Sequence, residues 1–151
     1  MLDFNSSNGI FHACNLSVED NKEDNKTELN HPYVVRTLQN NGIRGYISED
    51  ENKLNPANAI SFAHDKAQMF YQSEPYFTEN RVKILSVKGQ ALTENIVIFL
   101  ITCMNKAFSN FAWSSSYDTK MLQNIMFSLP EKTKYISNFN LMSEIIGGLL
   151  I

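Results

Sequence analysis

Between Gly9 and Val87, short apolar or alternating segments are separated by residues that favour turns. This pattern predicts β-strands, because successive side chains of a strand point to opposite faces, whereas Asn, Gly and Pro favour the connecting turns. We expect strands at residues 10–14, 33–37, 45–48, 59–63, 68–72 and 81–87. Pro56 and Pro75 lack the N–H group that a sheet needs, so both are expected at strand ends or in loops.

The pattern becomes helical near residue 93. Thr93-Glu94-Asn95 is a helix start signal, and the following residues, 96–108, are apolar over most of the circumference of a helix. We therefore expect a central helix buried between layers of the domain. Further along, we expect a loop at residues 110–117, a short helix or turn and a last strand within residues 121–129, and a C-terminal helix from residue 136.

These elements predict one domain of the α+β class. The expected architecture is a twisted, mostly antiparallel sheet in the N-terminal two thirds, a buried central helix and a C-terminal helix. A length of 151 residues and a hydrophobic content of 43% suit one compact domain. The last three residues, Leu149 to Ile151, are apolar and follow two glycines, which is typical of a fragment or of a part that awaits a partner.

The distribution of charge matters more than its total. The formal net charge is −3, which by itself argues against a basic nucleic-acid coat protein or a polycationic membrane binder. Residues 19–28, however, contain five acids and two lysines, and residues 49–51 are three consecutive acids. The rest of the chain is therefore mildly basic. We expect both acidic segments in exposed loops, with residues 20–30 forming one long acidic loop.

No chemistry of a metal centre or a membrane protein is visible. Cys14 and Cys103 are far apart and lack the spacing of a disulfide framework or a zinc site. The longest apolar run, residues 96–103, is much shorter than the roughly 20 residues that a membrane helix needs. We therefore expect a cytoplasmic protein with no metal, no cofactor and no membrane association.

A catalytic centre is not favoured. His64-Asp65 is the one neighbouring pair of a histidine and an acid, and adjacent residues of a strand or turn point in different directions. Nucleophile, phosphate-binding and dinucleotide motifs are absent from the sequence. Cys14 is interpreted as a small buried residue on a strand. A small hydrolase-like enzyme that uses His64 or Cys14 stays open as an alternative, but a binding module is favoured.

The segment from Arg36 to Arg44 has the chemistry of base recognition. Arginine pairs with guanine, and Asn or Gln pairs with adenine, through two hydrogen bonds each. Asn41-Gly42 is also a strong signal for a hairpin turn, from which the neighbouring arginines and amides would project.

Other loops carry weaker candidates for phosphate or base contacts. They are the segment from Lys53 to Asn58 with Lys66, the segment from Tyr71 to Arg81, and three consecutive serines beside Trp113. The candidate DNA-binding residues are Arg36, Thr37, Gln39, Asn40, Asn41, Arg44, Lys53, Asn58, Lys66, Tyr76, Arg81, Ser114, Ser115 and Ser116.

An ordered series of short sequences resembles a known family. The series is Pro32-Tyr33-Val34-Val35-Arg36-Thr37, Asn40-Asn41-Gly42-Ile43, Gly45-Tyr46-Ile47, Asn55-Pro56-Ala57-Asn58-Ala59-Ile60-Ser61-Phe62, Phe70-Tyr71-Gln72, the helix at 95–106, the segment at 117–122 and Leu129-Pro130. It resembles the target recognition domain of type I restriction–modification DNA specificity subunits and the related specificity modules of fused type II enzymes. The resemblance covers residues 10–146.

The resemblance implies a non-catalytic domain that lies against the major groove and reads one half of a split double-stranded DNA target. A partner DNA adenine methyltransferase subunit and a restriction subunit would perform the chemistry. In such subunits a long helix sets the distance to a second recognition domain. Base-reading loops differ between family members, so the resemblance transfers scaffold positions better than site residues.

The chain departs from that family in having one recognition domain and in stopping within the first turns of the spacer helix. We assign residues 1–135 to the DNA target recognition domain and residues 136–151 to the start of a C-terminal spacer or dimerisation helix. A homodimer through this helix is one expectation. A protein-interaction module that uses the apolar C-terminus is the third functional alternative.

Overall fold

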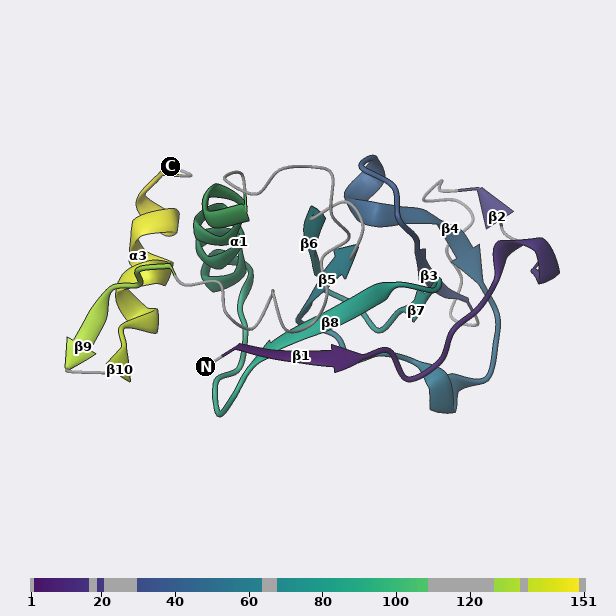
Figure 1. Ribbon diagram of the computed structural model, residues 1–151, viewed down its shortest axis with the longest axis horizontal. Coiled ribbons are helices and arrows are strands. Elements are labelled where there is room, and N and C mark those ends of the chain that lie inside the picture. Colours follow the sequence, from purple (N-terminus) through teal and green to yellow (C-terminus); the bar gives the residue numbers. More distant parts are fainter. Residues whose placement is uncertain are drawn as a thin grey trace.

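The fold has two α-helices and three sheets in the part of the chain that the structure describes (Figure 1). The computed structural model describes residues 2–16, 19–20, 30–63, 68–108, 127–133 and 136–149. Two sheets have four strands each, and the third is a two-stranded ribbon. The predicted α+β class is confirmed, with strands dominating the first two thirds of the chain and helices following.

The first large sheet has the strand order β1-β8-β5-β6, and all its pairings are antiparallel. Its strands are β1 (Leu2–Ser6), β8 (Val82–Val87), β5 (Ala59–Ala63) and β6 (Gln68–Gln72). Ile60 on β5 lies opposite Tyr71 on one side and Leu85 on the other. Strands β5 and β6 have the bounds that the sequence predicts.

The second large sheet has the order β2-β4-β3-β7. Its strands are β2 (Glu19–Asp20), β4 (Ile43–Ile47), β3 (His31–Val34) and β7 (Phe77–Thr78). β3 runs antiparallel to β4 and parallel to β7. The register of β3 and β4 shifts beside Arg44, because Val34 pairs with Ile43 whereas Tyr33 pairs with Gly45. This β-bulge leaves one extra residue on β4 directly after the turn that joins the two strands.

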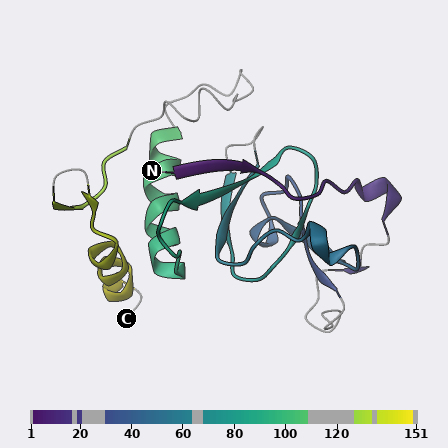
Figure 2. The ribbon, with the colours of Figure 1, turned by 90° about the horizontal axis from the view of Figure 1, so that it is seen from below.

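Helix α1 (Glu94–Phe108) is the buried helix that the sequence predicts. Ile96, Val97, Leu100, Met104 and Phe108 belong to a core that includes residues of β5, β6 and β8. Helix α3 (Phe139–Leu149) lies on the other side of α1 and contributes Met142 to the same core. Figures 1 and 2 show the resulting order of layers, from α3 through α1 to the first large sheet.

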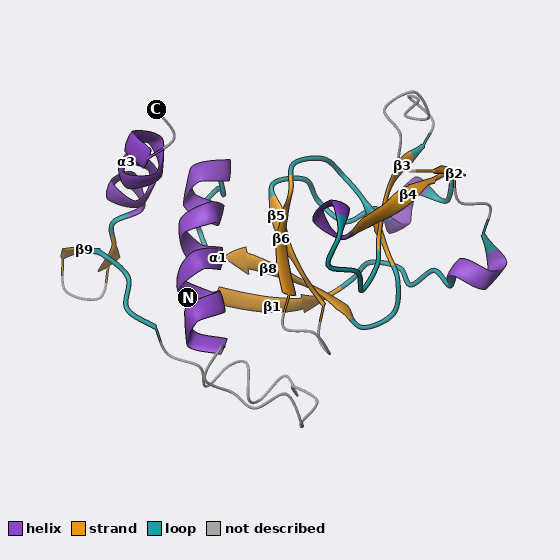
Figure 3. Ribbon diagram, turned by 90° about the horizontal axis from the view of Figure 1, so that it is seen from above, coloured by secondary structure: helices purple, strands orange, loops and turns teal. Residues whose placement is uncertain are grey.

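Two smaller cores hold the second sheet. Val34, Ala59, Tyr76, Val82 and Ile84 form a cluster that draws residues from both large sheets. A further cluster, formed by Tyr33, Ile47 and Phe77, packs against the chain around Phe11 and Leu16. Figure 3 shows the second sheet at the end of the molecule opposite α3. The turn between β3 and β4 therefore rests on a scaffold that is buried on both sides of its sheet.

Several expectations need correction. Residues 10–14 form no strand: Ile10 makes a single bridge to Thr78, and Ala13–Asn15 is a short 3₁₀ helix in which Cys14 is exposed. The predicted single sheet is two sheets. The ribbon of β9 (Glu131–Thr133) and β10 (Ile136–Ser137) occupies the expected beginning of the C-terminal helix, which instead begins at Phe139.

Other expectations fall outside the described residues. They concern residues 21–29 of the acidic loop predicted at 20–30, the loop at 110–117 and residues 121–126. Asp20 lies in strand β2 and not in a loop, and residues 127–130 are not part of the expected last strand, since β9 begins at Glu131. Within the described part of the chain, no helix is long and apolar enough to cross a membrane.

Candidate nucleic-acid interface

The connection between β3 and β4 contains three consecutive residues in the left-handed backbone region. Their φ angles are 49° at Asn40, 56° at Asn41 and 79° at Gly42. Asparagine tolerates this region better than most residues, and glycine adopts it freely. A Cβ atom at position 42 would lie 3.0 Å from the Phe70 ring, so glycine also satisfies a close approach. The Asn-Asn-Gly sequence therefore specifies a tight turn, which we call the Asn-Asn-Gly turn (residues 39–42).

Hydrogen bonds from β6 lock the Asn-Asn-Gly turn in place. The Asn41 side-chain amide donates to the Tyr71 carbonyl oxygen at 2.6 Å. In return, Gln72 Nε2 donates to the Asn41 carbonyl oxygen and to Ser61 Oγ, both at 3.0 Å. Gln72 and Ser61 are each 2% exposed. A buried amide thus connects the first sheet to the turn, and the turn is held by the scaffold rather than projecting freely.

Asn58 also contacts strand β6. It also has a left-handed backbone, with φ 54°, and its Oδ1 accepts a hydrogen bond from the Tyr71 hydroxyl at 2.6 Å. Tyr71 therefore contacts Asn41 through its backbone and Asn58 through its side chain. A shallow groove of about 420 Å³ is lined by residues of β6 and α1 and by Asn41. Two of the predicted amide side chains thus flank one exposed surface.

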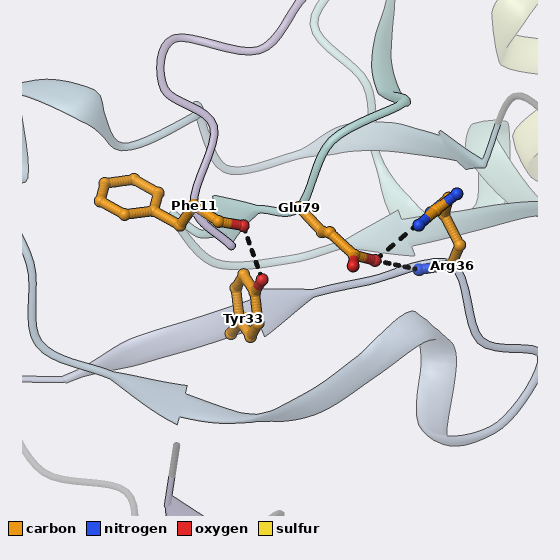
Figure 4. A network of polar contacts seen from close by, with 4 residues as sticks. All are labelled: Phe11, Tyr33, Arg36 and Glu79. Atoms are coloured by element: carbon orange, nitrogen blue, oxygen red, sulfur yellow. Dashed lines mark hydrogen bonds and ion pairs between the residues drawn. The ribbon is translucent and has the colours of Figure 1, made fainter. Parts of the chain in front are cut away.

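Arg36 is paired with an acid that the sequence did not indicate. Glu79 Oε2 accepts from both the backbone N–H and the Nε of Arg36 at 3.4 Å (Figure 4). The backbone N–H of Glu79 donates to the Val34 carbonyl oxygen at 2.9 Å, which places the carboxylate at the end of β3. This pairing orients the Arg36 side chain and lowers the positive charge that it presents.

A buried phenol lies beside this pair. The Tyr33 hydroxyl donates to the Phe11 carbonyl oxygen at 2.7 Å (Figure 4). Burial raises the pKa of Tyr33 to about 12; Glu79 adds to the increase, and the cations Arg44 and Arg36 oppose it. Glu79 and both arginines therefore act electrostatically on this one phenol.

The remaining described candidates are more dispersed. Arg44 is exposed at the β-bulge, and Arg81 is exposed with φ 63° in the turn before β8. Thr37 Oγ1 accepts from the Gln39 backbone N–H at 3.3 Å and so stabilises the approach to the Asn-Asn-Gly turn. Lys53 is exposed, with its ammonium 5.7 Å from the centre of the Phe11 ring.

Tyr76 does not lie at the surface, as a DNA contact would require. Its exposed fraction is 0%, and it belongs to the core that links the two sheets. Its hydroxyl has no hydrogen-bond partner among the described residues, and burial raises its pKa well above the ordinary value. Tyr76 therefore has a packing role. Lys66, Ser114, Ser115 and Ser116 lie outside the described residues.

The enzymatic alternative gains no support from the described residues. His64 lies outside them, and Cys14 is exposed with its thiol directed to its neighbour Asn15 at 3.6 Å. No group of three or more potential metal ligands occurs in the described part of the chain.

Tyr71 and Gln72 lie in the predicted segment from Tyr71 to Arg81 but were not among the individual candidate residues. Both also belong to the Phe-Tyr-Gln sequence that contributed to the resemblance, so a signal existed for both. Glu79 had none, because its partner Arg36 is 43 residues away in the chain.

The fold and this surface define an α+β domain whose exposed amide and guanidinium groups suit recognition rather than catalysis. The model of the type I restriction modification DNA specificity domain matches residues 8–142, and the chain belongs to this family. Domains of this class are the non-catalytic recognition components of restriction–modification systems. The resemblance inferred from the sequence is thereby confirmed.

One curated relative is a specificity subunit of a type II restriction enzyme, S.BcgI of Heyndrickxia coagulans. The two sequences are 24% identical over 115 residues, which cover 75% of this chain and 33% of the relative. The chain thus spans about a third of the length of this relative. No solved structure matches significantly.

Proposed function

We propose that this domain reads one half of a split double-stranded DNA target and directs a partner adenine methyltransferase and a nuclease to that site. The observation that carries the proposal is the locked Asn-Asn-Gly turn, with Arg36 three residues before it. Its amide and guanidinium groups match the donors and acceptors of adenine and guanine in the major groove. Because the backbone is fixed before binding, little conformational entropy is lost when the turn enters the groove.

Within this proposal the candidates have different roles. Asn40 and Arg36 supply base contacts, and Asn41 combines a base-facing position with its bond to Tyr71. Arg44 and Arg81, both exposed, supply phosphate contacts that set the orientation of the domain. Lys53 and Asn58 extend the contact surface along the neighbouring loop.

The experiment is methylation mapping in the assembled enzyme. The full-length protein is co-expressed with its neighbouring methyltransferase, and methylated adenines are located by sequencing. Asn40→Ala should relax one position of the site and weaken specific binding by about 1–3 kcal/mol. Arg36→Ala should relax a different position, whereas Arg44→Ala should weaken binding to all duplexes alike and reduce its salt dependence.

Asn140→Ala is the matched control, because Asn140 is an exposed asparagine on α3, far along the chain from the turn. It should leave the methylation pattern unchanged. Unaltered patterns and affinities for both Asn40→Ala and Arg36→Ala would contradict the assignment of the turn. A complex that forms but methylates no DNA would contradict the function itself.

We further infer that α3 (Phe139–Leu149) begins a spacer helix and pairs with a second copy of itself. Leu141, Ile145 and Leu149 are 38%, 39% and 74% exposed, and their spacing of four residues places them on one stripe. This stripe lies apart from Met142 and Ile146, which are buried. Sedimentation of the full-length protein and of its Ile145→Glu variant tests the pairing: the variant should be monomeric, and an unchanged sedimentation coefficient would contradict it.

A further inference from the structure

An exposed leucine lies within the predicted base-reading segment. Leu38 is 57% exposed and stands between Arg36 and the Asn-Asn-Gly turn. Isolated exposed apolar residues are common, so exposure alone has no functional meaning. The position of Leu38 is different because its immediate neighbours, Thr37 and Gln39, are polar and the residues beyond them are base-reading candidates.

The backbone around Leu38 is fixed on both sides. On one side, the Val35 N–H donates to the Gly42 carbonyl oxygen at 2.8 Å. On the other, the Gly42 N–H donates to the Gln39 carbonyl oxygen at 2.9 Å, and the Gln39 N–H donates to Thr37 Oγ1 at 3.3 Å. Leu38 therefore sits in a closed loop of short-range hydrogen bonds, anchored to β6 through Asn41. Its side chain remains in water because the rigid turn presents it there.

Major-groove chemistry offers one apolar partner for such a side chain. Thymine carries a 5-methyl group beside its O4 acceptor, and its pairing partner adenine presents N6 and N7. An aliphatic side chain close to asparagine side chains can thus contact both halves of one A·T pair or of adjacent pairs. Cytosine, guanine and adenine carry no methyl group at this edge unless they are modified.

We propose that Leu38 is a specificity-determining residue that packs against the 5-methyl group of a thymine in the target. This inference rests on the proposed DNA-reading function and adds an apolar contact to its polar ones. The contact buries about one methyl group, so its loss should weaken binding about fourfold. It involves no phosphate, so the salt dependence of binding should not change.

The test uses uracil, which differs from thymine by the absence of the 5-methyl group. The full-length protein, assembled with its methyltransferase, first selects a duplex from a random library. Each thymine of that duplex is then replaced singly by uracil, and affinities are measured by fluorescence anisotropy. The wild-type complex should bind one of these duplexes about fourfold more weakly. Leu38→Ala should bind the thymine duplex about fourfold more weakly and lose no further affinity on that uracil substitution.

Ile10→Ala is the matched control, because Ile10 is 54% exposed and lies on a different loop. It should keep the wild-type difference between thymine and uracil. A wild-type complex that is indifferent to every uracil substitution overturns the inference, and so does a Leu38→Ala complex as sensitive as the wild type. Selection of no duplex by the wild-type complex would instead refute the proposed function, so the two failures are distinguishable.

Discussion

Replacement of Gln72 by methionine should release the Asn-Asn-Gly turn from the first sheet. Methionine has a similar length and no hydrogen-bond donor, so Gln72→Met keeps most of the packing and removes two bonds. These bonds join Gln72 Nε2 to the Asn41 carbonyl oxygen and to Ser61 Oγ, each at 3.0 Å. Gln72 is 2% exposed, so the methionine side chain would occupy the same packed interior. The variant therefore tests the two hydrogen bonds and not the packing.

The expected cost follows from these two bonds. A neutral hydrogen bond contributes a net stabilisation of about 0.5–1.5 kcal/mol, so Gln72→Met should lower the free energy of unfolding by about 1–3 kcal/mol. Ser61 keeps a bond to the Phe70 carbonyl oxygen at 3.4 Å, which argues against a larger value. For a domain of this size, each kcal/mol lowers the melting temperature by about 2–4 °C.

Urea unfolding of the domain measures the change, and a double-mutant cycle with Ser61→Ala tests its cause. Both single variants remove the same bond, so the double variant should cost less than their sum by about 0.5–1.5 kcal/mol. Gln90→Met is the control, since the Gln90 side-chain amide donates to the carbonyl oxygen of its neighbour Ala91, and it should change stability by less than about 0.5 kcal/mol. Additive single effects would refute the reasoning.

Three further predictions concern residues around the same surface. Tyr76→Phe removes a buried hydroxyl that has no described partner, so thermal unfolding should show unchanged or higher stability; a loss above about 1 kcal/mol would reveal a hidden bond. Gly42→Ala should destabilise by more than Gly89→Ala, because both positions have positive φ but only at 42 would a Cβ meet the Phe70 ring; equal losses in urea unfolding would contradict this. The Tyr33 phenol, with its pKa raised to about 12, should stabilise the fold fully below pH 10 and progressively less as the pH rises toward 12. Urea unfolding between pH 9 and 11 should show this decline, and Tyr33→Phe should reduce it.

Local patterns predicted the elements that local interactions determine. β5, β6 and α1 were predicted closely. The short, mostly apolar segment of β5 is buried throughout, and the buried residues of α1 recur at helical spacing. Residues 10–14 are also mostly apolar, yet Ile10 and Cys14 are exposed. A short apolar segment predicts a strand only where a sheet is present for it to join.

Long-range pairing accounts for what the sequence did not reveal. β1 pairs with β8, which is about eighty residues away in the sequence. The division into two sheets depends on which strands pair, and the positions of the strands along the chain do not reveal this. The same limit applies to the site. Asn41-Gly42 signals its turn locally, whereas the contact of Arg36 with Glu79 exists only after β3 and β7 have paired.

Charge and geometry together explain how a domain with a net charge of −3 can read DNA. Arg36 is the arginine nearest to the start of the turn, and Glu79 offsets part of its charge. Phosphate attraction at this surface is therefore weak, and affinity must come from directional contacts on a preformed turn or from a partner that supplies cations. On the proposed function, the pairing of Arg36 with Glu79 favours base contacts over phosphate attraction at this end of the turn.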